Sequence, residues 1–226
     1  MTTAIAFDGN GVLYYRKKDF TYALMEYIRA RHCPGFDVEA GAADQFRFMR
    51  QSFDGTIGKT EAMSLFLDAA GITDPEARAD ILRKEIEYSK AISLFPTERE
   101  TLVELDRRGF ALGMITNSFQ SAAEKAAWFR NLGLDCIAKR IVSSIDAGVS
   151  KPDRGIYLEF ARRAGAGPGE IAFVGHEEAE LRGAREAGML PVSFNCGPEI
   201  RRELHLASFS DLLDLFPHPG CTPPRP

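Results

Sequence analysis

The chain has 226 residues, of which 45% are hydrophobic and 27% charged, and its formal net charge is −4 at pH 7. This length suffices for one large domain or for a core with a smaller inserted domain. The acidic balance excludes the basic surface that nucleic acids and anionic lipids require, so we expect neither as a partner. No apolar run approaches the roughly 18 residues that cross a bilayer. The four separated cysteines indicate free thiols and a cytoplasmic protein.

The first predicted element is a buried parallel strand over residues 4–8, which ends at Asp8 and is followed by Gly9 and Gly11. Open α/β sheets bind ligands at the carboxyl ends of their strands, where glycines allow a sharp turn. Taken alone, the stretch is more typical of an aspartate that holds its own backbone in a turn. The rest of the chain shifts that balance toward a site.

Residues 17–90 show helical apolar spacing throughout, and no strand is indicated. Glycine-containing breaks divide this stretch into about four helices. We therefore predict a helical insert over 17–90, and a core built from 1–16 and 91–216.

Beyond the insert, predicted strands and helices alternate. A capping box over residues 97–100 opens the first helix. Alternation implies right-handed βαβ units, and hence an α/β fold with a doubly wound parallel sheet. The proline-rich segment 217–226 is predicted to be disordered. The remaining strands are predicted at 110–116, 140–143, 171–175 and 190–194, and the helices at 118–132, 153–164, 178–187 and 210–216.

Polar residues follow the apolar runs of this sheet, and parallel strand ends meet at one edge. Thr116 and the first amides of the next helix are suited to phosphate oxygens, and Lys151 to neutralising charge. Asp8 is suited to covalent attack, and the acidic loop 176–180 to a divalent cation. Each feature alone is more typical of a helix cap or a solvated loop. Their order along the chain favours a single anion-binding site.

Four motifs carry a resemblance that spans residues 4–216: 7–13 (FDGNGVL), 114–118 (MITNS), 150–152 (SKP) and 173–189, which ends in GAREAGM. The chain resembles the haloacid dehalogenase-like hydrolase superfamily, in the branch with a helical cap inserted after the first strand. The resemblance implies a Rossmann-like core and a cap that selects the substrate.

The resemblance also implies a role for each matching residue. Asp8 would be the nucleophile that forms an aspartyl-phosphate with the assistance of Mg²⁺, and Lys151 would orient it. The backbone carbonyl of Asn10 would face the metal. Thr116 and Asn117 would bind the phosphoryl group of a small phosphorylated substrate.

Two positions depart from the family pattern. The family's phosphatases carry, two residues after the nucleophile, an aspartate that handles the leaving group's proton, and here that residue is Asn10. An amide cannot exchange this proton, so acid–base help worth roughly 10²–10⁴ in rate would be missing. His176 replaces a metal-binding aspartate, although Mg²⁺ prefers oxygen ligands. Glu177, or Glu180 at the second acidic position, is the candidate substitute ligand.

Three interpretations follow. The favoured one is a phosphatase or phosphotransferase with altered proton handling, in which His176 is a possible substitute base. The second is a catalytically impaired protein that binds a ligand or partner. The third, a metal-independent dehalogenase, is weakened because the tyrosine such relatives carry at the position of Asn10 is absent.

The insert is where substrate specificity is expected. Tyr14 lies at its hinge, and Arg47 and Arg50 lie about one turn apart on a predicted helix. Both arginines are candidates for a second anionic group of the substrate, although a solvated helix face is the more common role. A closing cap implies a small molecule rather than a polymer, because closure must exclude water. The sequence does not indicate an oligomeric state.

Overall fold

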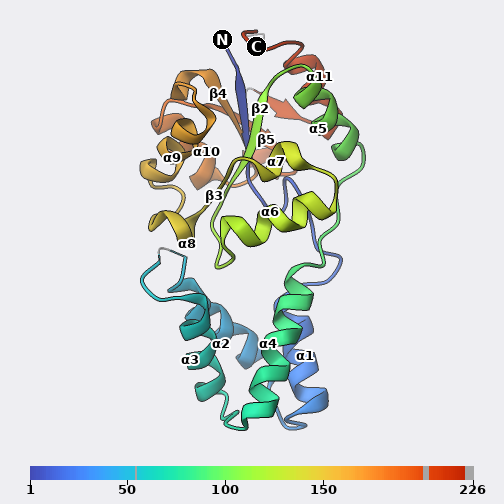
Figure 1. Ribbon diagram of the computed structural model, residues 1–226, viewed down its shortest axis with the longest axis vertical. Helices are drawn as coiled ribbons and strands as arrows, with labels where there is room; N and C mark the ends of the chain where they lie inside the picture. Colours follow the sequence, from blue (N-terminus) through green and yellow to red (C-terminus); the bar gives the residue numbers. More distant parts are fainter. Residues whose placement is uncertain (54, 201–203, 222–226) are drawn as a thin grey trace.

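The computed structural model describes residues 1–53, 55–200 and 204–221. Its centre is a parallel sheet of six strands in the order β3-β2-β1-β4-β5-β6 (Figure 1). The α/β fold with a parallel sheet is therefore confirmed. The strands are β1 (Ala4–Phe7), β2 (Ala111–Thr116), β3 (Ile141–Ser143), β4 (Ile171–Gly175), β5 (Leu190–Phe194) and β6 (His205–Leu206).

Helices cover both faces of the sheet, because alternate residues of each strand point to opposite sides. Ile5 and Phe7 of β1 pack in one cluster with residues of α5, α6, α7 and α11. Ala4 and Ala6 pack in a second cluster with residues of α9 and α10. The helices of the core are α5 (Glu98–Arg107), α6 (Ala122–Asn131), α7 (Asp135–Ala138), α8 (Ser144–Ala147), α9 (Arg154–Ala164), α10 (Glu178–Glu186) and α11 (Leu212–Leu215).

The insert forms a separate helical layer below the sheet in Figure 1. It consists of α1 (Phe20–Arg31), α2 (Val38–Arg50), α3 (Lys59–Ala69) and α4 (Pro75–Ser89), all within residues 17–90. Aspartates cap three of these helices by accepting backbone N–H bonds. The insert has its own apolar core, in which Leu24, Phe66 and Ile81 are buried. It is therefore a cap domain with independent packing.

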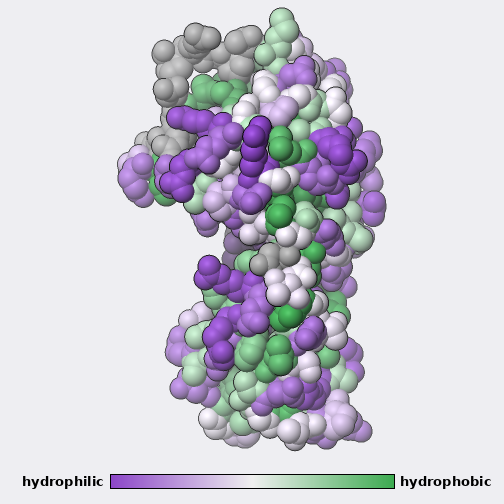
Figure 2. All heavy atoms as spheres, turned by 90° about the vertical axis from the view of Figure 1, so that its left-hand side faces the viewer, coloured by the Kyte–Doolittle hydropathy of each residue, from purple (hydrophilic) through white to green (hydrophobic). Residues whose placement is uncertain are grey.

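The cap is joined to the core by two segments that pair with each other. Tyr15 and Ser93 each donate a backbone N–H to the other's carbonyl at 2.9 Å. Phe119, in the loop after β2, packs against Phe20 and Phe53, with ring centroids 5.8 and 6.1 Å apart. These contacts hold the cap against the carboxyl edge of the sheet. Figure 2 shows the molecule narrowing between the two parts, with an indentation along one edge.

Two predicted features need correction, and one short strand was missed. The capping box at 97–100 does not form: Thr97 has φ 62° and makes no side-chain cap, and Glu98 instead accepts the N–H of Phe95 at 2.8 Å. The helix predicted from residue 118 begins at Ala122, where Ser121 and Glu124 form the capping box. The short strand β6 was not predicted, because two residues carry no periodic signal.

The disorder predicted from residue 217 is wrong for the part of the tail that the structure describes. Thr2 donates its N–H to Cys221 O at 2.8 Å and accepts from Gly220 N at 2.7 Å. Cys221 is buried in this bridge. The described part of the tail, up to Cys221, is held in place because the segment before β1 offers it backbone partners. Residues 222–226 lie outside the described residues. Among the described residues, no helix is long and apolar enough to cross a membrane.

Candidate active site

A cavity of about 650 Å³ lies between the carboxyl edge of the sheet and the cap helices α1 and α2. This volume suits a small ligand. Its walls bring together most of the residues singled out from the sequence. The predicted residues that line it are Asp8, Asn10, Tyr14, Arg50, Thr116, Asn117, Lys151, Glu177 and Glu180, together with His176.

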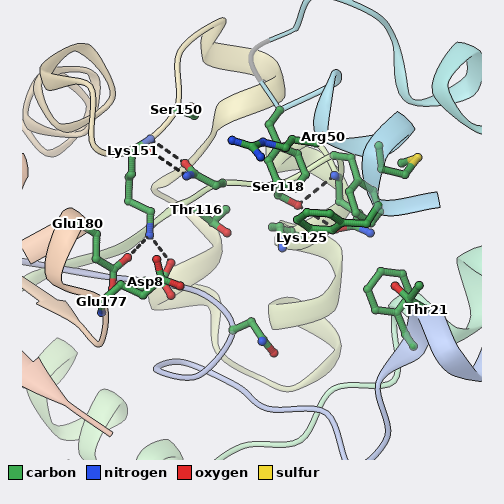
Figure 3. A pocket seen from close by; sticks show the side chains of 18 of the residues that line it. Asp8, Thr21, Arg50, Thr116, Ser118, Lys125, Ser150, Lys151, Glu177 and Glu180 are labelled. Atoms are coloured by element: carbon green, nitrogen blue, oxygen red, sulfur yellow. Dashed lines mark hydrogen bonds and ion pairs between the residues drawn. The ribbon is translucent and has the colours of Figure 1, made fainter. Parts of the chain in front are cut away.

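Asp8 and Lys151 form the centre of the site (Figure 3). Asp8 follows β1, and its Oδ1 accepts a hydrogen bond from Lys151 Nζ. The same Nζ donates to Glu180 Oε2 at 2.5 Å, and all three side chains are nearly buried. One ammonium group is thus shared between two carboxylates. Asp8 Oδ2 takes no part in the bond to Lys151.

The charges of this group keep Asp8 ionised. Burial alone would raise the pKa of Asp8. The Lys151 ammonium and the neighbouring His176 lower this pKa by more than burial raises it, and the result is a pKa of about 2. Burial lowers the pKa of Lys151, but Asp8 and Glu180 outweigh this and raise it well above its usual range. Asp8 is therefore a carboxylate at any physiological pH, as a nucleophile must be.

Glu180 is fixed by the start of its own helix. Its Oε1 accepts the backbone N–H groups of His176 at 2.6 Å and of Glu177 at 3.0 Å. A Cβ at Gly175 would lie 2.6 Å from this oxygen, so glycine is required for the carboxylate to fold back. Tyr157 donates its hydroxyl to the backbone carbonyl of Glu180 at 2.8 Å. These bonds position Glu180 to hold Lys151.

His176 lies beside the nucleophile. Its Nδ1 is 3.4 Å from Asp8 Oδ2 and 3.5 Å from Glu180 Oε1, and this buried nitrogen has no hydrogen-bond partner among the described residues. The ring packs on Gly11, where a Cβ would lie 3.1 Å from His176 Cε1. The Asp8 carboxylate raises the pKa of His176, although burial opposes this.

Asp8, His176 and Glu180 form a group that could hold a divalent metal, since each offers an atom within 4.8 Å of the others. The unpartnered Nδ1 of His176, aimed at two carboxylate oxygens, fits such a use. Glu177 does not join this group: its side chain is 69% exposed and lies 3.8 Å from the other ring nitrogen of His176. The side-chain oxygen of Asn10 accepts a hydrogen bond from Arg16 Nη1 at 3.5 Å.

The loop after β2 supplies two more of the predicted residues. Thr116 is buried at the strand end, and its Oγ1 lies 3.0 Å from the position of a Cβ on Gly9. The Asn117 side chain bonds the backbone of another site residue. Its Oδ1 accepts Lys151 N at 2.7 Å and its Nδ2 donates to Lys151 O at 3.0 Å. The Asn117 side chain therefore positions the backbone of Lys151.

The two cap arginines lie in different surroundings. Arg50 lines the cavity, whereas Arg47 does not. Arg47 pairs with Asp44 at 2.9 Å, lies over the ring of Phe48, and is 61% exposed. Sequence reasoning missed Lys125, which lines the cavity from α6 and donates to Tyr14 Oη at 2.9 Å. A single lysine in an amphipathic helix gives no sign of burial.

Comparison with known proteins decides the family. The model of the haloacid dehalogenase-like hydrolases matches residues 2–188. The chain belongs to this family. This hydrolase is similar to the glyceraldehyde 3-phosphate phosphatase of Methanopyrus kandleri. The two sequences are 28% identical over 203 residues, which cover 87% of this chain and 85% of the relative.

Dehalogenases are also similar to this hydrolase. The (S)-2-haloacid dehalogenase 4A of Burkholderia cepacia is 27% identical over 135 residues, which cover 60% of this chain and 56% of the relative. The structure of the 2-haloacid dehalogenase of Pseudomonas syringae pv. tomato DC3000 superposes with a TM-score of 0.73 at 23% identity, covering 95% and 97% of the two chains. This structural likeness shows the shared fold.

Proposed function

We propose that this hydrolase is a phosphatase that acts on a small phosphorylated metabolite through an aspartyl-phosphate at Asp8. The observation that carries the proposal is the ionised Asp8 carboxylate, held by Lys151 at the floor of a cavity of about 650 Å³. The similarity to a phosphatase extends over most of both chains, whereas that to the curated dehalogenase covers 56% of the relative.

In the first step, Asp8 Oδ2 attacks the phosphorus, an Oδ2–P bond forms and the bond to the leaving oxygen breaks. Lys151 keeps Oδ1 engaged, so the attacking oxygen is the one that faces His176. In the second step, water attacks the phosphorus, the Oδ2–P bond breaks and phosphate and a proton leave. In this proposal Thr116, which lies at the end of β2 and lines the cavity, donates its hydroxyl to a phosphoryl oxygen.

The proposed site lacks, at position 10, a residue that would protonate the leaving oxygen, because Asn10 cannot serve as an acid. The leaving oxygen must take its proton from water or, where His176 is protonated and does not bind the metal, from that imidazole, which lies beside Asp8. The proposed enzyme therefore favours substrates with good leaving groups, whose oxygens need little protonation.

The proposed cofactor is Mg²⁺, held by Asp8 and the neighbouring donors. Bound there, a divalent cation would neutralise charge that develops on the phosphoryl oxygens. The donor set of two carboxylates and one imidazole is also suited to other divalent metals, because imidazole is a poorer ligand for Mg²⁺ than oxygen. The Asn10 carbonyl is a further ligand proposed from the sequence, whereas Glu177, proposed with it, lies outside this group of donors.

The test is phosphate release from a panel of small phosphate esters, including an activated aryl phosphate, with and without Mg²⁺. Asp8→Asn serves as the blank, since it keeps the shape of the side chain and removes the nucleophile. We expect metal-dependent release that drops by at least about 10³-fold in the blank. Equal release by the blank, or halide release from a 2-haloacid without phosphate release, would overturn the proposal. No turnover at all would favour a binding protein.

A further inference from the structure

Lys125 carries a positive charge that nothing in the described residues neutralises. Lys125 is 1% exposed, and its only hydrogen-bond partner there is the hydroxyl of Tyr14 at 2.9 Å. The ammonium also lies 4.8 Å from the ring centroid of Trp128 and 5.3 Å from that of Tyr14. No carboxylate of the described chain lies within ion-pair distance of it.

A buried cation without a counter-ion is energetically costly, and aromatic faces offset only part of that cost. Structural lysines in such places are normally paired with Asp or Glu. Lys125 instead lines the same cavity as Asp8. An anion that enters this cavity would supply the missing partner, which makes Lys125 a candidate ligand-binding residue.

Two other side chains of the cavity wall also have a nitrogen donor without a partner among the described residues. Gln120 is 3% exposed, its Oε1 accepts the hydroxyl of Ser118 at 2.8 Å, and its Nε2 has no partner among the described residues. Arg16 has a buried Nε that likewise lacks a partner there. Both line the cavity with Lys125. The nitrogen donors of Lys125, Gln120 and Arg16 would together suit a group that only accepts, such as a carboxylate.

We propose that Lys125, Gln120 and Arg16 bind a carboxylate group of the substrate whose phosphoryl group reacts at Asp8. The substrate class is then a short-chain phosphate ester that also carries a carboxylate. This inference rests on the proposed phosphatase function for the reacting end only. The carboxylate site itself stands on the donors of these three residues in the cavity wall, of which Figure 3 labels Lys125.

Tyr14 links the two ends of the site and sets the length of the substrate. Its hydroxyl lies 3.3 Å from the position of a Cβ on Gly9, next to Asp8, and 2.9 Å from Lys125 Nζ. Only a short chain fits between groups so close. Burial raises the pKa of Tyr14, but Lys125 and Arg16 lower it by more, which shows how positive this part of the cavity is.

The test uses equilibrium binding of two unreactive probes to the full-length protein. Phosphonoacetate carries both anionic groups, and methylphosphonate lacks the carboxylate. Titration calorimetry would compare the wild type with Lys125→Met and with Lys139→Met, a matched change at an exposed lysine outside the cavity. We expect the wild type and Lys139→Met to bind phosphonoacetate at least about tenfold more tightly than methylphosphonate. Lys125→Met should bind the two equally.

The proposal is overturned if the wild type shows no preference, or if Lys125→Met keeps it. Circular dichroism would verify folding, and Gln120→Leu serves as the second variant should Lys125→Met not fold; it must weaken the preference. Phosphate release from 2-phosphoglycolate and from ethyl phosphate is measured in parallel. A binding preference without turnover refutes the phosphatase function and leaves the carboxylate site standing. Turnover without any preference refutes the carboxylate site alone.

Discussion

Lys151 Nζ lies 2.5 Å from Glu180 Oε2 and also donates to Asp8 Oδ1, so the lysine bonds the nucleophile and a second buried acid at once. Glu180 is itself fixed by two backbone N–H groups at the start of α10. The second acid therefore positions Lys151, and Lys151 positions Asp8. This chain of contacts determines which oxygen of Asp8 remains available for reaction.

Removal of the shared ammonium should destabilise the fold. In Lys151→Met, two buried carboxylates lose their cation, and we expect the free energy of unfolding at pH 7 to fall by about 3–5 kcal/mol. Urea denaturation would measure it, with Lys139→Met as the control. With Lys151 present, the depressed pKa of Asp8, about 2, contributes stability above pH 4 that is lost as the pH falls toward 2. The deficit of Lys151→Met should therefore shrink as the pH falls from 4 toward 2, and a deficit as large at pH 2 as at pH 7 would contradict this.

Asn10→Asp should restore an acid beside the leaving group. Asn10 lines the cavity, so an aspartate there would lie within it. We expect kcat for alkyl phosphates to rise by about 10²-fold, with a much smaller change for an aryl phosphate that leaves without protonation. Asn10→Gln is the control that adds length without an acid. Equal gains for both substrate types would show that proton transfer is not the missing function.

His176→Asp should change the metal preference of the site. The substitution replaces the one nitrogen donor near Asp8 and Glu180 by oxygen, the donor that Mg²⁺ prefers. We expect Mg²⁺ to bind the variant at least about tenfold more tightly than the wild type. Competition of Mg²⁺ against Mn²⁺, followed by electron paramagnetic resonance of free Mn²⁺, reports binding without turnover. A wild type that already binds Mg²⁺ as tightly as the variant would argue against a role for His176 in this selectivity.

The stability of the protein should depend on pH through Glu98, a residue that does not line the cavity. It is fully buried, and burial raises its pKa to about 8, although the Phe95 N–H bond opposes this. Because its folded pKa exceeds the unfolded value of 4.5, its contribution is fully present below pH 4.5 and is lost as the pH rises through 8. The wild type should lose up to about 1.4 kcal/mol per pH unit in this window relative to Glu98→Gln. Parallel pH dependences of the two proteins would contradict the prediction.

Much of the core could be predicted because its strands are buried on both faces and therefore appear as continuous apolar runs. The proximity of Asp8 to Lys151, which are 143 residues apart in sequence, followed from the rule that parallel strands end at one edge. The insert was recognisable from its helical spacing. The position of β6 was not, since two residues carry no pattern.

The missing parts of the site depend on contacts between distant residues. Lys125 is buried because it meets Tyr14, 111 residues away, and no local signal reports that contact. The use of the Asn117 side chain on the Lys151 backbone is likewise a tertiary event. Arg47 and Arg50 have the same local pattern, yet only Arg50 lines the cavity. Side-chain roles of this kind emerge only from the folded structure.

The most direct test of the central claim is to look for the covalent intermediate. Enzyme quenched in acid during turnover of an aryl phosphate would be digested and analysed by mass spectrometry. We predict a peptide containing Asp8 that carries one phosphoryl group, which disappears when the substrate is exhausted and never forms in Asp8→Asn. Continued phosphate release with Asp8 unmodified, and undiminished in Asp8→Asn, would contradict the account.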